Sequence, residues 1–426
     1  MTLLLGALFL FLLMGVPIAY SLGLASFVYF LAVHPELIQV IPQRLFAGMD
    51  SYALIALPLF ILMGHLMNEG GITRRLIDFC MMFVGRFSGG LGLVNVGSSM
   101  LFGGISGSST SDTASIGSVL IPEMKRRGYP PPFAAGLTVA SSTMGMIIPP
   151  SIPMVLFAVT AQESVGRLFL GGIVPGLMVG VFQLSLVYGL ARRRGYPRER
   201  VARSIRQMFE QLARSALVLT MPLVVVGSVV FGIATATESA AIGVFYALVV
   251  GALVIRHLSV QDVVRSLRLA AMTSAKIMMI IAFSQVFIWV LALERGPERL
   301  AGWIVEAGFS GAGLLLLIVL IVLAVGTFVD VSPAILLLTP VFLPAAVSAG
   351  ISPVLFGVVF VSGLAVGACT PPVGNCLNVC SIVSGLRIGE IFWGALPFLA
   401  ANVLVLVLIS IFPALVLTLP RLIMGP

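Results

Sequence analysis

Long apolar runs separated by short charged loops dominate the chain. A helix that crosses a membrane needs about 20 predominantly apolar residues. Nine runs approach or exceed that length: residues 3–33, 51–68, 133–160, 167–192, 214–233, 236–256, 268–293, 353–382 and 387–417. The pattern therefore predicts an all-α polytopic membrane protein. Charge mixed with apolar residues predicts amphipathic interfacial helices at 35–49, 72–86, 197–212, 258–268 and 296–307.

Two further apolar stretches, 88–125 and 310–348, have centres made of small and polar residues. The first centre reads Gly-Gly-Ile-Ser-Gly-Ser-Ser-Thr-Ser-Asp over 103–112, and the second reads Gly-Thr-Phe-Val-Asp-Val-Ser-Pro over 326–333. The arm from 88 to 102 is short for a full crossing. We therefore predict two re-entrant hairpins whose tips meet inside the membrane.

The chain matches itself at an offset of 222 residues. The matches need no gap between 87 and 150 and concentrate in Gly and Pro, which fix backbone shape more than they fill volume. They include Gly104 with Gly326, Gly145 with Gly367, and Pro149-Pro150 with Pro371-Pro372. Five predicted spans separate the two hairpins, so the second repeat is predicted to be inverted, which is a plan of secondary transporters.

A Pro-Pro pair interrupts the helix that follows each hairpin. Proline removes a backbone donor and pushes the preceding residue out of helical geometry, so both helices should unwind there and free carbonyl oxygens. Such backbone is tolerated at membrane depth only beside protein or a watery cavity. Uncharged carbonyl and hydroxyl oxygens suit a hard alkali cation better than a transition metal.

These oxygens predict two cation sites, one per repeat, flanking one substrate site. The first site takes Gly104, Ser106, Ser108, Ser109, Ser142, Thr143, Gly145 and Pro149. The second takes Gly326, Thr327, Val329, Asp330, Gly367 and Thr370. Helix starts at the tips would direct positive dipole ends at an anionic substrate, for which the candidates are Ser109, Asp112, Pro150, Asp330, Ser332 and Asn375.

Each of these features also has a structural interpretation. Gly/Ser-rich stretches serve close helix packing, and proline in a spanning helix often only kinks it. Asp112 and Asp330 could be helix N-caps instead of ligands, although acids inside a membrane are usually functional. The paired occurrence of the features in both repeats favours the functional interpretation.

Composition and charge agree with a membrane protein. Charged residues make up 9% of the chain, against roughly 25% in soluble domains. If the N-terminus is cytoplasmic and each hairpin returns to its own side, all but five of the 24 basic residues lie inside, as the positive-inside rule asks. The five are Arg44, Arg167, Arg295, Arg299 and Arg421, and the C-terminus is then periplasmic. The net charge of +8 therefore needs no nucleic acid.

No enzyme is predicted. The glycine-rich segment lacks the lysine of a phosphate-binding loop, and His34, His65 and His257 are scattered. Cys376 and Cys380 have no partner at zinc-ligand spacing.

The run at 103–124 resembles the large membrane subunit of tripartite ATP-independent periplasmic (TRAP) transporters, and so do Ile-Ile-Pro-Pro-Ser-Ile at 147–152, Gly-Thr-Phe-Val-Asp at 326–330 and Thr-Pro-Pro-Val-Gly-Asn at 370–375. The resemblance covers essentially the whole chain. It implies an elevator-type fold related to divalent-anion/sodium symporters, with sodium (two or more ions) as the coupling ion. It implies uptake of an organic acid, such as a C4-dicarboxylate, a sialic acid or another sugar or keto acid, across the bacterial inner membrane. The implied partners are a periplasmic binding protein and a small four-helix membrane subunit.

On that resemblance the chain divides into five segments. They are scaffold helices with a first arm (1–86), the first transport repeat (87–165), scaffold helices with a second arm (166–308), the second transport repeat (309–385) and a C-terminal scaffold helix (386–426). The alternative is a stand-alone sodium/dicarboxylate symporter that works without a binding protein.

Overall fold

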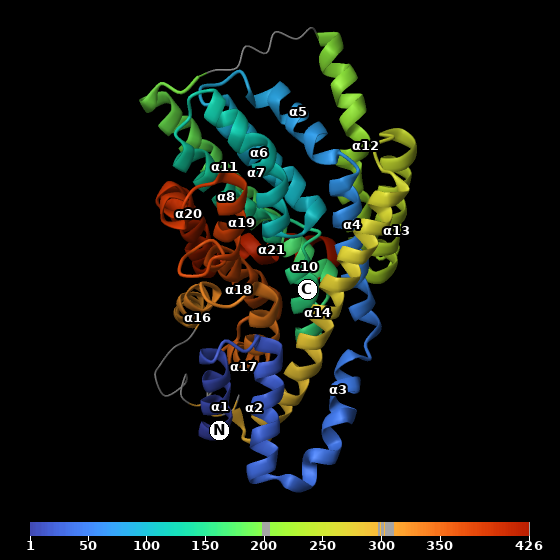
Figure 1. The fold of residues 1–426 in the computed structure, drawn as a ribbon, viewed down its shortest axis with the longest axis vertical. Coiled ribbons are helices and arrows are strands. Elements are labelled where there is room, and N and C mark those ends of the chain that lie inside the picture. Colours follow the sequence, from blue (N-terminus) through green and yellow to red (C-terminus); the bar gives the residue numbers. More distant parts are fainter. Residues whose placement is uncertain (198–204, 297–298, 300–301, 303–310, 426) are drawn as a thin grey trace.

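The computed structural model describes residues 1–197, 205–296, 299, 302 and 311–425 (Figure 1). This part of the chain is helical and contains no strand. The first half holds α1 (Thr2–Leu13), α2 (Ile18–Val33), η1 (Pro35–Val40), α3 (Ile41–Met49), η2 (Tyr52–Ile55), α4 (Ala56–Glu69), α5 (Ile72–Val84), α6 (Gly90–Ser106), α7 (Ser109–Arg126), α8 (Pro131–Ser142), α9 (Met144–Ile147), α10 (Ile152–Ala161) and α11 (Val165–Arg194). The second half holds α12 (Ile205–Val230), α13 (Ala236–Val249), η3 (Val250–Val254), α14 (Val260–Leu293), α16 (Gly311–Gly326), α17 (Val331–Ser348), α18 (Pro353–Gly367), α19 (Asn375–Ser384), α20 (Ile388–Ile411) and α21 (Ala414–Met424).

The first apolar run is not the single span predicted at 3–33. It breaks at Gly15, which has a positive φ of 80°, and at Pro17, so that α1 and α2 fold back on each other (Figure 1). Glycine adopts this backbone conformation without strain, and proline cannot continue the helical hydrogen bonding. The prediction failed because apolar length alone does not show where a run turns.

This turn changes the position of the N-terminus. The backbone nitrogen of Met1 lies 3.1 Å from the carboxylate of Glu294 at the end of α14, and the hydroxyl of Tyr29 donates to the same carboxylate at 2.8 Å. The charge pattern put Arg295 outside and the N-terminus inside. Because Met1 is in contact with Glu294, the residue before Arg295, the N-terminus and Arg295 lie on the same side. The two assignments therefore cannot both be correct.

Several other predicted boundaries also change. The predicted amphipathic helix at 258–268 and the span at 268–293 form one helix, α14, which begins with a capping box between Ser259 and Asp262. At 1.5 Å per residue its 34 residues extend about 51 Å, well beyond a hydrocarbon core of about 30 Å. The run at 387–417 is divided into α20 and α21. The run at 353–382 is interrupted between α18 and α19, as predicted from Pro371-Pro372.

The remaining amphipathic predictions have mixed outcomes. The segments at 35–49 and 72–86 are helical, as α3 with η1 and as α5. Of 197–212, residues 198–204 lie outside the described part, and the rest continues into α12 with the predicted span at 214–233. The segment at 296–307 falls almost wholly outside the described residues.

Six described helices are long and apolar enough to cross a membrane, compared with nine predicted spans. They are Tyr52–Glu69, Val165–Arg194, Ala236–Val254, Val260–Leu293, Val331–Ser348 and Ile388–Ile411. The bent pair Pro131–Ile147 and Ile152–Ala161 makes a seventh if it counts as one span. Val331–Ser348 was predicted as a hairpin arm, and its length alone does not exclude a crossing.

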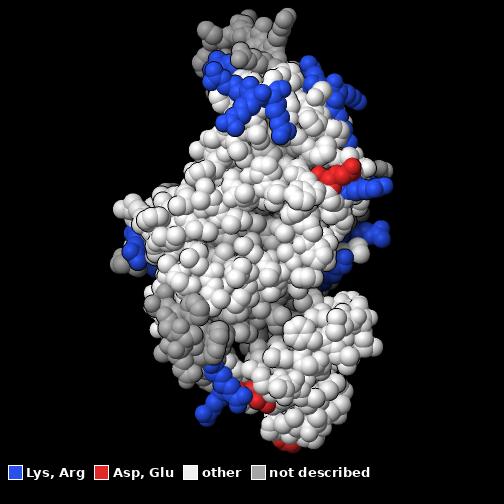
Figure 2. Space-filling model, turned by 90° about the vertical axis from the view of Figure 1, so that its left-hand side faces the viewer, with Lys and Arg blue, Asp and Glu red and all other residues white. Residues whose placement is uncertain are grey.

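One large apolar core includes residues of the helices from α4 through α13 and from α16 through α21. A smaller core is formed by α1, α2 and the end of α14. Leu337 and Val341 of α17 pack against the smaller core, so α14 and α17 connect the two. On the surface, Lys and Arg gather towards one end, and much of the face between the two ends is uncharged (Figure 2). This distribution is what a chain with a membrane-embedded middle requires.

Candidate functional site

The tip of the first hairpin is a two-residue turn between α6 and α7. Gly107 has a φ of 62°, which a residue with a side chain rarely adopts, and Ser108 has the extended backbone of an N-cap. The hydroxyl of Ser106 donates to the carbonyl of Ser108 at 3.3 Å, and Ser108 and Thr110 share a hydrogen bond of 3.0 Å. The tip thus presents several hydroxyl and carbonyl oxygens within one turn.

This tip packs directly against the first broken helix. The helix is interrupted after α9 and resumes as α10, with a bend of 40° and a cis bond between Pro149 and Pro150. The amide of Ile152 donates to the carbonyl of Gly107 at 3.3 Å. A Cβ placed on Gly103 would lie 2.9 Å from the Cα of Gly145, so only glycine permits this approach.

The residues predicted for the first cation site are therefore only partly brought together. Gly104 lies against the carbonyl of Pro149, and Gly145 lies against the carbonyl of Ser108, which places these four and Ser106 at one junction. The other three hydroxyls have partners of their own. The hydroxyl of Thr143 donates to the carbonyl of Ala140, and that of Ser142 donates to the carbonyl of Val139. The hydroxyl of Ser109 shares a hydrogen bond with the thiol of Cys376.

The second tip forms a similar junction. It joins α16 to α17 through residues 327–330, and the carbonyl of Thr327 accepts from the amides of Val373 at 3.1 Å and Gly374 at 3.4 Å. A Cβ on Gly326 would lie 3.0 Å from the Cα of Gly367. The bond between Pro371 and Pro372 is cis, as in the first junction. In both halves of the chain, the hairpin tip and the interrupted helix are thus in contact through backbone atoms.

Side chains of the second predicted site are less enclosed than those of the first. Asp330 is exposed, and its carboxylate accepts from the amide of Val331 and from Asn375 Nδ2, both at 2.9 Å. Thr370 donates to the carbonyl of Val366, and Val329 and Ser332 are half-buried beside the tip. Asp330 therefore does act as an N-cap, and this role leaves it open to a ligand.

Asp112 lies in the first turn of α7, one turn after Ser109, and is completely buried. Ser99 of α6 donates to its Oδ1 at 3.3 Å, and its Oδ2 has no hydrogen-bond partner among the described residues. It is not the N-cap of α7 either, because Ser108 occupies that position. Direct contact of Asp112 with a substrate is therefore not supported in this conformation.

Asp112 belongs to a polar network that the sequence pattern did not reveal. Ser99 shares a hydrogen bond of 3.0 Å with Ser141, which donates to Asn95 at 3.1 Å, and Asn95 donates to Thr138 at 2.7 Å. Asn95 and Ser99 are four residues apart and share a helix face. That spacing was the signal that could have revealed the network.

Two more polar residues were missed because each is isolated in an apolar span. Gln183 of α11 and Asn402 of α20 bond to each other at 2.8 Å, and both donate to the carbonyl of Ala140. Asn402 also donates to Thr143 at 3.0 Å. They therefore bond to backbone and hydroxyl groups at the end of α8, ahead of the first break.

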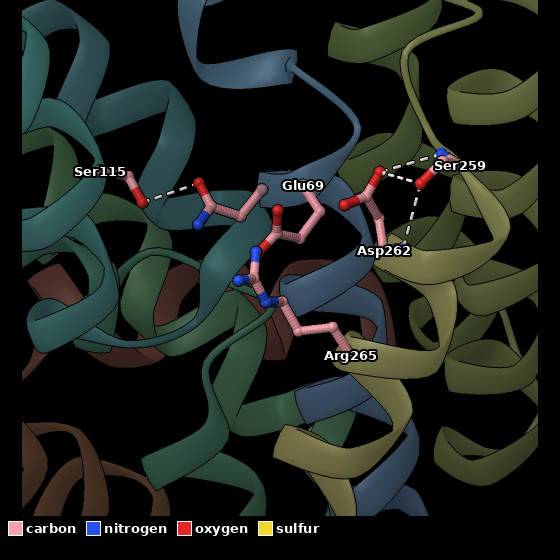
Figure 3. A network of polar contacts seen from close by, with 6 residues as sticks. Glu69, Ser115, Ser259, Asp262 and Arg265 are labelled. Atoms are coloured by element: carbon pink, nitrogen blue, oxygen red, sulfur yellow. Dashed lines mark hydrogen bonds and ion pairs between the residues drawn. The ribbon is translucent and has the colours of Figure 1, made fainter.

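A polar link connects the first hairpin to α4. Ser115 of α7 donates to Asn68 Oδ1 at 2.7 Å, and Thr73 of α5 donates to the same oxygen at 3.2 Å. Figure 3 shows Ser115 facing the end of α4, where Glu69 meets Arg265 of α14 at 4.0 Å. One oxygen of Asn68 thus contacts both the hairpin and the helix that precedes it.

The chain matches one family along almost its whole length. Residues 5–415 match the family described as the tripartite ATP-independent periplasmic transporter, DctM component. The sialic acid TRAP transporter large permease protein SiaM of Vibrio cholerae is 36% identical over 411 residues, which are 96% of either chain. The C4-dicarboxylate TRAP transporter large permease protein DctM of Rhodobacter capsulatus is 37% identical over 431 residues, which are 98% of either chain.

Solved structures of transporters share the fold at low sequence identity. The YdaH transporter of Alcanivorax borkumensis superposes with a TM-score of 0.64 at 16% identity, over 89% of each chain. MtrF of Neisseria gonorrhoeae superposes with a TM-score of 0.64 at 13% identity, over 88% of this chain and 83% of that one. At this identity the likeness concerns the fold alone.

Proposed function

This chain belongs to the family of DctM components of tripartite ATP-independent periplasmic transporters, and we propose that it carries out sodium-coupled uptake of an organic acid across the inner membrane. The observation that carries the proposal is the pair of junctions in which a hairpin tip meets a broken helix backbone to backbone. At each junction, hydroxyl and carbonyl oxygens gather where helical hydrogen bonding is interrupted.

The oxygens at the two junctions fit sodium. At the first junction the oxygen atoms that could bind the ion belong to Ser106, Ser108 and the carbonyl of Pro149, and none carries a charge. At the second, the carboxylate of Asp330 is added to backbone groups around Thr327 and Thr370. Oxygen ligands suit hard cations, and no group of three or more His, Cys, Asp or Glu residues that could hold a metal ion occurs in the described part of the chain.

An organic acid is the proposed substrate. The relatives above are named for sialic acid and for C4-dicarboxylates, which are both carboxylates. Asn375 and Ser332 lie at the N-termini of α19 and α17, where helix dipoles favour negative charge. Ser109 and Pro150 lie beside the first tip, and a bound cation at either junction would add positive charge for the acid.

The helix boundaries support a duplicated transport unit. Shifted by 222, α7 falls on residues 331–348, the bounds of α17, and the start of α8 falls on the start of α18. The same shift moves α11 to 387–416, which overlaps α20 at 388–411. An inverted repeat of this kind places a substrate site near the midplane in many transporters.

The proposed mechanism is an elevator motion of the duplicated unit past a frame. Helix α20 packs mainly on α8, and α11 packs on α21, α20, α6 and the broken helices, whereas α4 packs on α13 and α14, and α12 packs on α13. We therefore place α11 and α20 in the moving unit, although the sequence-based division put 166–308 and 386–426 with the scaffold. The arm α5 joins α4 of the frame to the first hairpin.

The proposed partners are a periplasmic binding protein and a small membrane subunit. The isethionate TRAP transporter permease protein DctMQ of Oleidesulfovibrio alaskensis is 36% identical and matches 95% of this chain, but this match covers only 64% of its own length. The additional third of that relative is what a fused small subunit would need. The stand-alone symporter remains the competing proposal.

Uptake in proteoliposomes tests the proposal. We expect accumulation of a C4-dicarboxylate or sialic acid only under an inward sodium gradient, and only with the small subunit and the binding protein added. A potassium gradient of equal size is the control. Sodium-driven uptake by the chain alone would favour the stand-alone symporter, and uptake that ignores sodium would contradict the coupling.

The proposed topology predicts the labelling of two single cysteines. The charge bias puts Gly195, which ends α11, inside, and Ser352, which precedes α18, outside. In this arrangement the contact between Met1 and Glu294 places the N-terminus outside as well. A membrane-impermeant maleimide added to intact spheroplasts should label cysteine at 352 and not at 195. Labelling of both positions would remove the inverted-repeat argument.

A further inference from the structure

Four completely buried side chains meet where the first hairpin touches the second broken helix. They are Ser109 at the start of α7, Ser142 at the end of α8, Cys369 after α18 and Cys376 at the start of α19. The hydroxyl of Ser109 and the thiol of Cys376 are 3.1 Å apart. The thiol of Cys369 and the hydroxyl of Ser142 both donate to the carbonyl of Val139, at 3.4 Å and 2.8 Å. The contact therefore joins the two halves of the chain directly.

The Ser109–Cys376 pair connects the two junctions through adjacent residues. Ser109 follows Ser108, whose carbonyl lies against Gly145 at the first junction. Cys376 follows Asn375, which donates to Asp330 at the second tip. Each member of the pair is in the first turn of a helix, so a shift at one junction is transmitted to the other without an intervening flexible segment.

Packing alone does not require polar groups at this place. The helix contact between α7 and α19 has a counterpart between α17 and α10. At the offset of 222, the positions of the four side chains are taken by Val331, Leu364, Ile147 and Met154, which are all buried and apolar. The contact between α17 and α10 is thus made with apolar residues, whereas the equivalent contact between α7 and α19 contains a hydroxyl–thiol pair.

We propose that the Ser109–Cys376 contact couples the two proposed cation sites, so that binding at one junction raises the affinity of the other. This inference rests on the sodium coupling proposed above. The pair positions the start of α7 against the start of α19, and neither thiol needs to touch an ion. Without the pair, each tip would settle on its broken helix independently, and the two sites would fill independently.

The test measures sodium-dependent uptake in proteoliposomes that hold the complete transporter. Wild type should show cooperative sodium dependence. Cys376→Ala should raise the half-saturating sodium concentration about five-fold or more and lower the Hill coefficient towards about one. Ser109→Ala should do the same, and the double variant should be no worse than either single variant, because both changes remove one interaction.

The chain offers matched controls. Cys380→Ala removes a buried thiol of the same size one turn further along α19, where it donates to the carbonyl of Ala135, and it should leave the Hill coefficient unchanged. Cys376→Ser keeps a hydrogen-bonding group and should restore cooperativity. If Cys376→Ala does not fold, Cys376→Val fills the space without a hydrogen bond and takes its place.

The outcomes separate the two proposals. Sodium-driven uptake with the same Hill coefficient in wild type, Cys376→Ala and Cys380→Ala would overturn the coupling and leave the proposed function intact. Equal losses in Cys376→Ala and Cys380→Ala would also overturn it, since a cavity would then be the cause. Uptake by wild type that does not depend on sodium would overturn both.

Discussion

Replacing Gly367 with alanine is expected to reduce sodium-driven uptake at least ten-fold. A Cβ on Gly367 would lie 2.8 Å from the Cα of Gly326 and 3.0 Å from its carbonyl carbon, and both are backbone atoms that cannot rotate away. Overpacking a tight contact costs about 1–3 kcal/mol, and 1.4 kcal/mol is a factor of about ten in occupancy. The extra methyl group would hold the second tip away from its broken helix.

The matched control for Gly367→Ala is Gly313→Ala on the same hairpin. A Cβ on Gly313 meets nothing within 4 Å, so this variant should transport like wild type. Initial uptake rates at fixed sodium, normalised to the amount of folded protein, are the measurement. Full activity of Gly367→Ala would mean that the second junction opens during transport more widely than the close approach of its backbones implies.

A covalent link between Asn68 and Ser115 is expected to abolish transport and to leave sodium binding intact. Asn68 lies in the last turn of α4 of the proposed frame, and Ser115 lies on α7 of the proposed moving unit, with 2.7 Å between the bonded side-chain oxygens. An elevator motion must separate these two residues, so a disulfide or short crosslink between cysteines at 68 and 115 should hold the unit in one position. Reduction of the link should restore uptake.

The control is a crosslink inside the frame. The hydroxyl oxygens of Ser228 in α12 and Ser239 in α13 are 2.8 Å apart, and both helices belong to the proposed frame, so cysteines at these positions should crosslink without loss of transport. Crosslinking is measured on gels, uptake in proteoliposomes, and sodium binding by the thermal stability of the purified protein. If uptake persisted with the 68–115 link complete, local gating would replace the elevator motion.

Both broken helices were predictable because their causes are local. Pro149-Pro150 and Pro371-Pro372 end a helix by their own geometry, and each break lies where the sequence puts it. The turn at Gly107 likewise follows from a residue without a side chain between two polar neighbours. The positions of the first tip and of the first break along the chain were therefore available from the sequence, whereas the approach of Gly104 to Pro149 depends on how the two elements pack.

Side-chain direction could not be predicted in the same way. Ser106 and Ser109 are three residues apart in one motif. Ser106 donates to the carbonyl of Ser108 within the tip, whereas Ser109 bonds to Cys376, which is 267 residues further along the chain. Asp112, one turn after Ser109, accepts a hydrogen bond from Ser99 of α6. Which face of α7 meets α6, α8 or α19 depends on long-range packing, and the hairpin sequence holds no signal for it.

The sequence by itself determined the helical membrane class, the duplication pattern and the places where helices break, because apolar length, proline and glycine act on the chain locally. Only the tertiary structure decided that Met1 meets Glu294, that Gln183 and Asn402 bond to each other beside the end of α8, and that Asn68 links the hairpin to α4. These features depend on which helix surfaces meet. A buried polar group must find a partner wherever the fold supplies one, and that partner is usually far away in the sequence.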